Sequence, residues 1–266
     1  MKKLLLVLFV IMAGAGWLYW GNITPVVTTH NVQLDDLPNE FSGLKIIQLS
    51  DLHDAEFGEG QANLIQAVTD RAPDLIFLTG DMIDSNRYDL EQSLALVRGL
   101  QQVAPMYYVT GNHEIATKEV EYIKAELSGL GVTVLSNESA QFTKGNVSLE
   151  IFGIEDPLDG VPVHHALEQH PREGAVRLTL SHRPEVFEEY VTAGEQLVFT
   201  GHAHGGQIRL WGIDGVIAPG QGFFPAYTSG VYEEAGTQMI VSRGLGNSVF
   251  PLRVGNRPEI VEVILE

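Results

Sequence analysis

The sequence predicts an α/β fold, a four-layer α-β-β-α sandwich of two mixed sheets preceded by one N-terminal transmembrane or signal helix. Three observations lead to this prediction. Short apolar runs alternate with helical segments in the first half of the chain, strand-like runs dominate the second half, and the N-terminal segment is strongly apolar. Such alternation is typical of βαβ units around a buried, mostly parallel sheet with helices on its outer faces.

The first half of the chain contains three apolar runs of the length of a buried strand. They cover residues 45–50, 75–79 and 107–110. Between the second and the third run, apolar residues recur at the spacing of one helix face, at Leu90, Leu94, Val97 and Leu100. The pattern therefore predicts strands and helices in alternation around one sheet.

The second half is richer in strand-like runs, with shorter spacers between them. One helix is expected from Pro184 to about Val191, and few clear helices follow it. This change of pattern favours a second sheet. The strand-like runs beyond residue 130 are residues 132–135, 149–153, 177–181, 197–200, 207–210, 239–242 and 259–265.

The N-terminal segment resembles a signal sequence or a signal anchor. Lys2 and Lys3 precede an uncharged apolar run from Leu4 to Trp20, which as a helix spans about 25 Å, near the lower limit for crossing a bilayer. Terminal aromatic residues favour retention in the membrane, whereas the small residues at 13–15 are compatible with cleavage. A buried core helix is disfavoured because the segment has no polar face.

The charges that flank this segment predict its orientation. Lysines precede it and acidic residues follow it, so we expect a single-pass protein of the cell membrane with its main domain outside the cytoplasm. Cleavage would instead give a secreted or cell-wall-associated protein. The chain then divides into residues 1–21 (signal anchor or signal peptide), 22–44 (tether and first strand) and 45–266 (main domain).

Composition limits the possible functions. The 34 acidic and 16 basic residues give a formal net charge of −18, which would repel a phosphate backbone, so duplex nucleic acid is not an expected partner. The chain has no cysteine, which excludes disulfides, thiolate metal sites and thiol nucleophiles. Bound divalent metals would reverse the local charge, so small phosphate substrates remain compatible with the composition.

Side chains that can bind metals follow the predicted strands, at the points where the strands end. The first three groups are Asp51-Leu52-His53, Gly80-Asp81 and Gly111-Asn112-His113-Glu114. Two later groups are Ser181-His182 and Gly201-His202-Ala203-His204-Gly205-Gly206. Loops at the carboxyl ends of the strands converge on one crevice in open α/β sheets. Carboxylates and imidazoles without sulfur suit Mn²⁺, Fe or Zn²⁺.

Each motif alone is weak, but their order resembles the calcineurin-like metallophosphoesterase superfamily. This resemblance covers roughly residues 45 to 210. Gln207 after the His-x-His motif, Ala218-Pro219-Gly220 and the stretch from Ser242 to Ser248 are similar to a membrane-associated bacterial branch of phosphohydrolases. The resemblance then extends over nearly all of the chain that follows the apolar segment.

The resemblance implies two divalent metal ions and assigns their ligands. The ligands of one ion would be Asp51, His53, Asp81 and His204. The ligands of the other would be Asp81, Asn112, His182 and His202, so that Asp81 bridges the two. In the family pattern His113 is not a ligand. It would approach the scissile phosphate and donate a hydrogen bond or a proton as charge develops.

These residues predict hydrolysis of a phosphoester. Two cations about 3.5 to 4 Å apart lower the pKa of a bridging water and stabilise the attacking and leaving oxygens. The expected reaction is attack of metal-activated hydroxide on a phosphodiester, a phosphomonoester or a pyrophosphate bond, without a covalent phosphoenzyme. The expected substrate is a phosphorylated small molecule or a lipid, and the membrane segment makes lipid-linked phosphates attractive.

Two other functions are weighed against this one. A catalytically silent metal-binding scaffold would keep the fold without turnover, but the presence of His113 argues against it. A metallo-hydrolase of amides or lactams usually carries a His-x-His-x-Asp-His cluster, which this sequence lacks.

Several further residues have two possible roles each. Asp54 and Glu114 could orient imidazoles from behind or be solvent-facing loop charges. Asp84 is expected to fix a loop or begin a helix, and it is not counted as a ligand. Arg243 could bind a substrate phosphate or form an ordinary ion pair.

One group of histidines and one pair of phenylalanines also have two possible roles each. His164, His165 and His170 lie near prolines, and a solvated loop is expected there. Phe223 and Phe224 could line a membrane-facing or acyl groove, although packing in the core is the more common role of such a pair.

Overall fold

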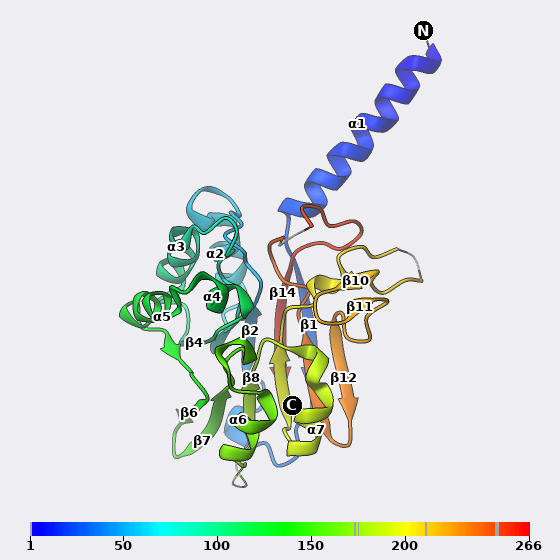
Figure 1. Ribbon diagram of the computed structural model, residues 1–266. Helices are drawn as coiled ribbons and strands as arrows, with labels where there is room; N and C mark the ends of the chain where they lie inside the picture. Colours follow the sequence, from blue (N-terminus) through cyan, green and yellow to red (C-terminus); the bar gives the residue numbers. More distant parts are fainter. Residues whose placement is uncertain (1, 173, 175, 211, 248–249) are drawn as a thin grey trace.

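The computed structural model describes residues 2–172, 174, 176–210, 212–247 and 250–266 (Figure 1). Met1 and Ser248, which belong to the predicted anchor and to the last motif, lie outside the described residues. Two six-stranded mixed sheets face each other, and helices cover their outer faces. This arrangement confirms the predicted four-layer α-β-β-α sandwich.

The first sheet is built on three adjacent parallel strands, β2, β3 and β4. All five residues of β3 are buried, as expected for a central strand covered on both faces. Strand β1 runs parallel to β14, which is antiparallel to β2. In sheet order the strands are β1 (Val26–Val32), β14 (Glu259–Leu265), β2 (Lys45–Leu49), β3 (Leu75–Thr79), β4 (Met106–Val109) and β5 (Thr133–Val134).

The second sheet has four parallel strands inside and an antiparallel strand at each edge. The edge strands β6 and β12 were missed in the sequence because their exposed, largely polar residues form no apolar run. In sheet order the strands are β12 (Gly230–Glu234), β13 (Thr237–Val241), β9 (Leu197–Thr200), β8 (Arg177–Leu180), β7 (Val147–Gly153) and β6 (Glu138–Lys144).

Three apolar layers hold the sandwich together. Residues such as Phe77 and Phe199 pack between the sheets, with ring centroids 4.9 Å apart. Helices α2 (Ala62–Thr69), α3 (Leu90–Leu100) and α5 (Val120–Gly129) bury one face each against the first sheet. Helices α6 (Val163–Gln169) and α7 (Phe187–Ala193) cover the second sheet.

Short elements complete the fold. A small hairpin, β10 (Ile217–Ala218) with β11 (Gly222–Phe223), stands apart from both sheets. Helix α4 (Asn112–Thr117) follows β4. The 3₁₀ turns are η1 (Asn39–Phe41), η2 (Glu59–Gln61), η3 (Pro157–Asp159), η4 (Pro184–Val186) and η5 (His204–Gly206).

Two local predictions were wrong. The predicted strand 207–210 is an irregular segment with only isolated bridges, because Gln207 follows two glycines and has a φ of 59°, which ends extended pairing. The expected solvated loop around His164 and His165 is helix α6, whose Val163, Ala166 and Leu167 have helical spacing and are buried.

Helix α1 (Lys2–Ile23) projects away from the body (Figure 1). In the described part of the chain it is the one helix long and apolar enough to cross a membrane, with 22 residues, a mean hydropathy of 2.0 and none of its span buried. Its last turn contacts the domain. The Asn22 amide donates to the Arg253 carbonyl at 2.9 Å, and the Arg257 guanidinium lies 4.3 Å from the centre of the Trp20 ring.

Candidate metal centre

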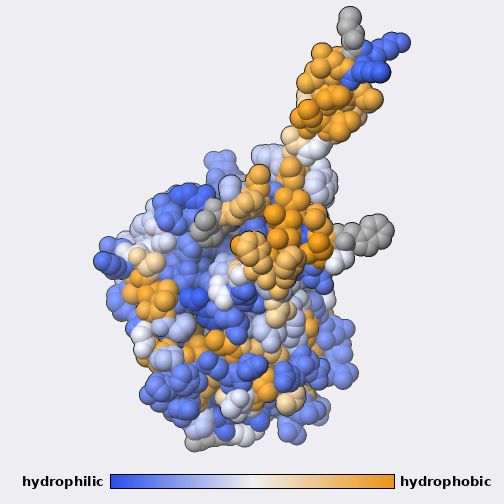
Figure 2. Space-filling model, turned by 45° about the vertical axis from the view of Figure 1, so that its right-hand side comes forward, coloured by the Kyte–Doolittle hydropathy of each residue, from blue (hydrophilic) through white to orange (hydrophobic). Residues whose placement is uncertain are grey.

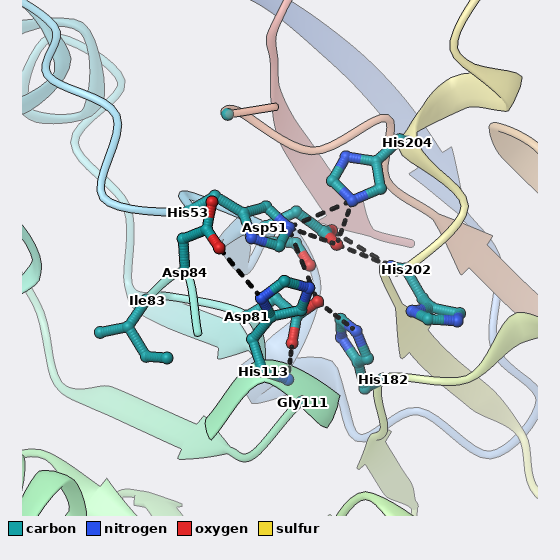
Figure 3. Close-up of polar contacts among 12 residues, drawn as sticks. Asp51, His53, Asp81, Ile83, Asp84, Gly111, His113, His182, His202 and His204 are labelled. Carbon is teal, nitrogen blue, oxygen red and sulfur yellow. Dashed lines mark hydrogen bonds and ion pairs between the residues drawn. The ribbon is translucent and has the colours of Figure 1, made fainter. Parts of the chain in front are cut away.

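The predicted metal-binding side chains meet between the two sheets' strand ends (Figure 3). Loops after β2, β3 and β4 bring Asp51, His53, Asp81 and Asn112, and loops after β8 and β9 bring His182, His202 and His204. Two groups consist of predicted ligands only, with donor atoms within 4.8 Å of one another: Asp51, His53, Asp81 and His204, and Asp81, His182 and His202. Both groups contain Asp81. A third group of possible donors, His53, Asp84 and His113, includes two residues that were not predicted as ligands.

The first group is compact and fully buried. The Nε2 atoms of His53 and His204 lie 3.1 Å apart, and their rings stack. His204 Nε2 lies 3.5 Å from Asp51 Oδ1, and His53 Nε2 lies 3.6 Å from Asp81 Oδ2. Two nitrogen lone pairs and two carboxylates thus point toward one small space.

The second group centres on His182. Its Nδ1 donates to the Thr79 carbonyl at 2.8 Å, which leaves Nε2 as the atom that faces Asp81 Oδ2, 3.2 Å away. An unprotonated nitrogen and a carboxylate oxygen repel each other, so this contact favours a proton or a cation between them. Asn112 belongs to the same neighbourhood, because the next N–H, that of His113, donates to Asp81 Oδ1 at 2.8 Å.

Burial sets the protonation of the other imidazoles. It lowers the pKa of His53, His202 and His204, so these rings are neutral, which is the form that binds metals. His182 differs. Burial lowers its pKa, but the Asp81 carboxylate outweighs burial and raises the pKa to about 10.

The backbone of the ligand loops is strained. Positive φ angles occur at Asp51 (51°), His53 (47°), Asp81 (51°), His202 (63°) and His204 (47°). Non-glycine residues rarely adopt this conformation, and such outliers cluster at functional sites, where the surrounding structure holds them. The loops therefore place these five side chains at a cost in local stability.

Glycines let the loops approach one another. A Cβ on Gly80, whose φ is 84°, would lie 2.7 Å from both Gly111 N and His182 Nδ1. A Cβ on Gly201 would overlap Ser50 and the Asp51 carboxylate. These two positions have no room for a side chain, and any residue other than glycine would push ligands apart.

Glu114 and Asp54 hold loop backbone and do not orient imidazoles. Glu114 is also fully buried, so neither interpretation made from the sequence, an acceptor behind an imidazole or a solvent-facing charge, applies to it. The buried Glu114 carboxylate accepts hydrogen bonds from the N–H groups of Asp81, Met82, Ile83 and Gly111, at 2.7 to 3.2 Å. Burial raises its pKa to about 7. Asp54 accepts from the N–H groups of Asp84 and Asp89, and burial raises its pKa to about 6.

His113 lies at the edge of the first group, with its ring edge-on to His53 and 4.5 Å between ring centres. The Ser85 N–H donates to His113 Nδ1 at 3.0 Å. Asp84 Oδ1 lies 3.5 Å from the same nitrogen, and Asp84 also accepts from the Asn86 N–H, so its loop-fixing role is confirmed.

Two arginines touch the imidazoles and were not found from the sequence. Arg183 Nη1 lies 2.9 Å from His202 Nε2, and Asp156 binds its guanidinium through two oxygens. Arg253 Nη2 lies 3.4 Å from His204 Nδ1. Arg183 directly follows His182 and could have been considered, whereas Arg253 lies in a loop without any recognisable motif.

The remaining candidates lie outside the centre. Arg243 forms an ion pair with Glu259, with 2.8 Å between Nη2 and Oε1, which supports the ion-pair reading. His164 is half exposed on α6 and faces Glu189. Phe223 and Phe224 are each 73% exposed, so packing in the core, the more common role of such a pair, does not apply here.

The donor set fits divalent cations. Several of its polar atoms are buried and make no hydrogen bond within the described structure: His53 Nδ1, Asn112 Oδ1, His182 Nε2 and His202 Nδ1. Buried polar atoms normally have partners, and imidazole nitrogens gathered around a shared carboxylate are the chemistry of a metal site. Clustered aspartates and histidines of this kind are compatible with divalent metal binding.

Comparisons with known proteins agree with this geometry. The chain is 30% identical over 262 residues to the uncharacterized metallophosphoesterase YkuE of Bacillus subtilis, covering 96% of this chain and 91% of YkuE. It is 28% identical over 226 residues to the phosphodiesterase YaeI of Escherichia coli, covering 81% and 80%. A bovine transmembrane protein with metallophosphoesterase domain is 29% identical over 265 residues, covering 91% of this chain and 57% of that protein.

A solved structure and a family model complete the comparison. The structure of TT1561 of Thermus thermophilus superposes with a TM-score of 0.51 at 14% identity, over 77% of this chain and 91% of that one, which shows the shared fold. The model of the calcineurin-like phosphoesterase family matches residues 44–206, which include every residue of both donor groups. The chain therefore belongs to the calcineurin-like phosphoesterase family.

Proposed function

We propose that this protein hydrolyses a phosphodiester with two divalent metal ions as cofactors. One observation carries the proposal: two buried groups of aspartates and histidines share the Asp81 carboxylate, and the donor atoms within each group lie within 4.8 Å of one another. The ion in the first group would be held by Asp51, His53, Asp81 and His204, and the ion in the second by Asp81, Asn112, His182 and His202. The name of the relative YaeI, a phosphodiesterase, supports the bond type.

When bound, the ions would lower the pKa of a water molecule and polarise the phosphoryl oxygens. Mn²⁺, Fe or Zn²⁺ suit this nitrogen and oxygen donor set. The chain supplies the rest. Asp81 and its neighbours are held in place by Glu114, and His113 lies beside the first group, where its Nε2–H can donate to a phosphoryl or leaving oxygen.

The substrate that we propose is a lipid-linked phosphodiester, and the domain that we propose to cleave it lies outside the cytoplasm. Helix α1 supports membrane association, and its preceding lysines support that orientation. The bovine relative is named as a transmembrane protein, which also supports membrane association. A phosphodiester in the bilayer would lie within reach of a domain held at its surface.

The test is turnover by the full chain in detergent, first stripped of metal and then given Mn²⁺, Fe²⁺ or Zn²⁺. The substrates are bis-p-nitrophenyl phosphate, a diester, and p-nitrophenyl phosphate, a monoester. We expect hydrolysis of the diester only with metal, and its loss in Asp81→Asn, which removes the shared ligand charge. Tyr122→Phe, at an exposed side chain on α5, serves as the control.

Two outcomes would contradict the proposal. Equal turnover of the diester by the stripped and the loaded protein would exclude metal-dependent hydrolysis. Binding of metal without turnover of the diester, the monoester or a lipid diester would favour the catalytically silent scaffold of the same fold.

A further inference from the structure

Seven large apolar side chains gather on one surface of the domain, which we call the apolar face. Among the described residues outside α1, eleven large apolar side chains are exposed, and seven of them belong to this face. Figure 2 shows apolar residues gathered on the body close to the base of α1. The members are Leu210, Ile213, Ile217, Phe223, Phe224, Phe250 and Leu252.

The apolar face has a defined shape because polar contacts hold its segments. The Gln207 amide donates to the carbonyls of Phe250 and Leu252, at 3.1 and 3.0 Å. The N–H of Val216 donates to the Gly206 carbonyl at 2.9 Å, and that of Phe224 donates to the Val216 carbonyl at 2.9 Å. The hairpin and the 250–252 loop are therefore both attached to the turn that carries His204.

Helix α1 leaves the domain beside this face. Arg253, the neighbour of Leu252, exchanges two backbone hydrogen bonds with the Asn22 side chain, at 2.8 and 2.9 Å. The Trp20 ring packs against the guanidinium of Arg257, which is four residues after Arg253. The end of the apolar helix thus lies beside the apolar face, and Figure 2 shows apolar residues on the body at the base of the helix.

A cavity lies at this face, and His204, a predicted metal ligand, is part of its lining. The volume of the cavity is about 420 Å³, and its lining also includes Gln207, Phe250, Ile217, Ala218 and Pro219. The lining is mostly apolar, and its polar side chains are those of His204 and Gln207. Such a cavity suits a molecule with a hydrocarbon part joined to a phosphate.

We propose that the apolar face rests on the bilayer in which α1 stands and that the cavity takes the hydrocarbon part of a lipid phosphodiester from that bilayer. The proposal rests on the proposed phosphodiesterase function for its second half. A bilayer is the occupant that fits, because the face lies at the base of a helix able to span one. The net charge of −18 argues against electrostatic attraction to anionic lipids, so apolar contact must supply the attachment.

The first experiment measures contact with lipid without any enzyme assay. Because the chain has no cysteine, Phe223→Cys can carry a single environment-sensitive fluorophore in the full chain, reconstituted in phosphatidylcholine nanodiscs. Tyr122→Cys, at a side chain 53% exposed on α5, is the matched control. Spin-labelled phosphatidylcholine should quench the label at 223 at least threefold more than the label at 122. Equal quenching at both positions would overturn the proposal. Weaker quenching at 223 than at 122, because a second copy of the chain covers position 223, would also overturn it.

The second experiment measures use of the face in catalysis. In the same nanodiscs, Phe223→Ser with Phe224→Ser should lower the hydrolysis of a dialkyl-chain p-nitrophenyl phosphodiester about tenfold, and turnover of soluble bis-p-nitrophenyl phosphate should stay within twofold. Tyr122→Ser is the control. Equal losses on both substrates would reject the role of the face. Failure of the unsubstituted protein on both substrates would instead reject the phosphodiesterase function, and the quenching result would still decide whether the face meets lipid.

Discussion

The backbone N–H of Ser85 lies 3.0 Å from Nδ1 of His113. An N–H can only donate, so in the neutral ring Nδ1 is the acceptor and the proton is on Nε2. Nε2 is then the nitrogen that carries the proton. One backbone group in a loop after β3 thus selects the tautomer that a general acid or hydrogen-bond donor requires.

Substitution of His113 should remove turnover without removing metal. His113→Ala is expected to lower kcat by about 10²- to 10⁴-fold, the usual contribution of a positioned proton donor. Steady-state kinetics on bis-p-nitrophenyl phosphate, with metal content measured by mass spectrometry, tests this. Asp81→Asn is the contrasting variant, because it should lose metal as well as activity. Unchanged kcat in His113→Ala would show that the ring has no part in the chemical step.

Glu114 should matter for stability as well as for the centre. Glu114→Gln places an amide donor against N–H groups that now have a carboxylate acceptor, at a cost of about 3 kcal/mol. This corresponds to a decrease in Tm of roughly 10 °C for a domain of this size. Calorimetry of the metal-free protein measures it. Glu121→Gln on α5, with a side chain 85% exposed, should leave Tm within about 2 °C.

Gly201 should tolerate no side chain. In Gly201→Ala the new methyl group would overlap Ser50 and the Asp51 carboxylate, so we expect metal affinity to fall by at least about tenfold, as for other displacements of ligand support. Gly129→Ala is the matched control, because nothing lies within 4 Å of that position at the end of α5. Titration of both stripped variants with Zn²⁺ compares them, and equal affinities would show that the loop can shift at no cost.

Removal of metal should lower the thermal stability. A ligand present at 100 times its Kd stabilises the folded state by about 2.7 kcal/mol, so chelation should decrease Tm by roughly 5 to 10 °C. The loss should be restored by added Mn²⁺ or Zn²⁺ and should be absent in Asp81→Asn. A Tm that chelator does not change would mean that the donor groups bind no cation in the folded protein.

The core strands and the ligands at their ends were predictable from the sequence for one reason. Strands such as β3 and β9 are buried on both faces, so their residues form continuous apolar runs, and the polar residues that follow stand out. The order of these polar residues along the chain resembles that of the calcineurin-like family. The predicted positions of Asp51, Asp81 and His204 within two donor groups are consistent with this structure, whereas their role as ligands stays a prediction.

Other parts of the site left no pattern in the sequence. Arg253 contacts His204 from 49 positions further along the sequence, in a loop with no regular spacing. Glu114 was noticed only for its place beside a ligand, and its four backbone contacts depend on how two loops cross. The hairpin β10–β11 was missed because strands of two residues are too short for any alternation. Contacts between loops that are distant in the sequence can be identified only when the fold is known.

The join between α1 and the domain has a consequence for where the protein can work. Only Thr24 and Pro25 separate the helix from β1, a stretch that spans at most about 10 Å, and Asn22 is fastened to Arg253. With α1 in a bilayer, the candidate metal centre would have a nearly fixed height and tilt. The protein and a lipid substrate would then diffuse in the plane of the same membrane. The rate at which they meet would depend on the number of substrate molecules per membrane area and not on a concentration in solution.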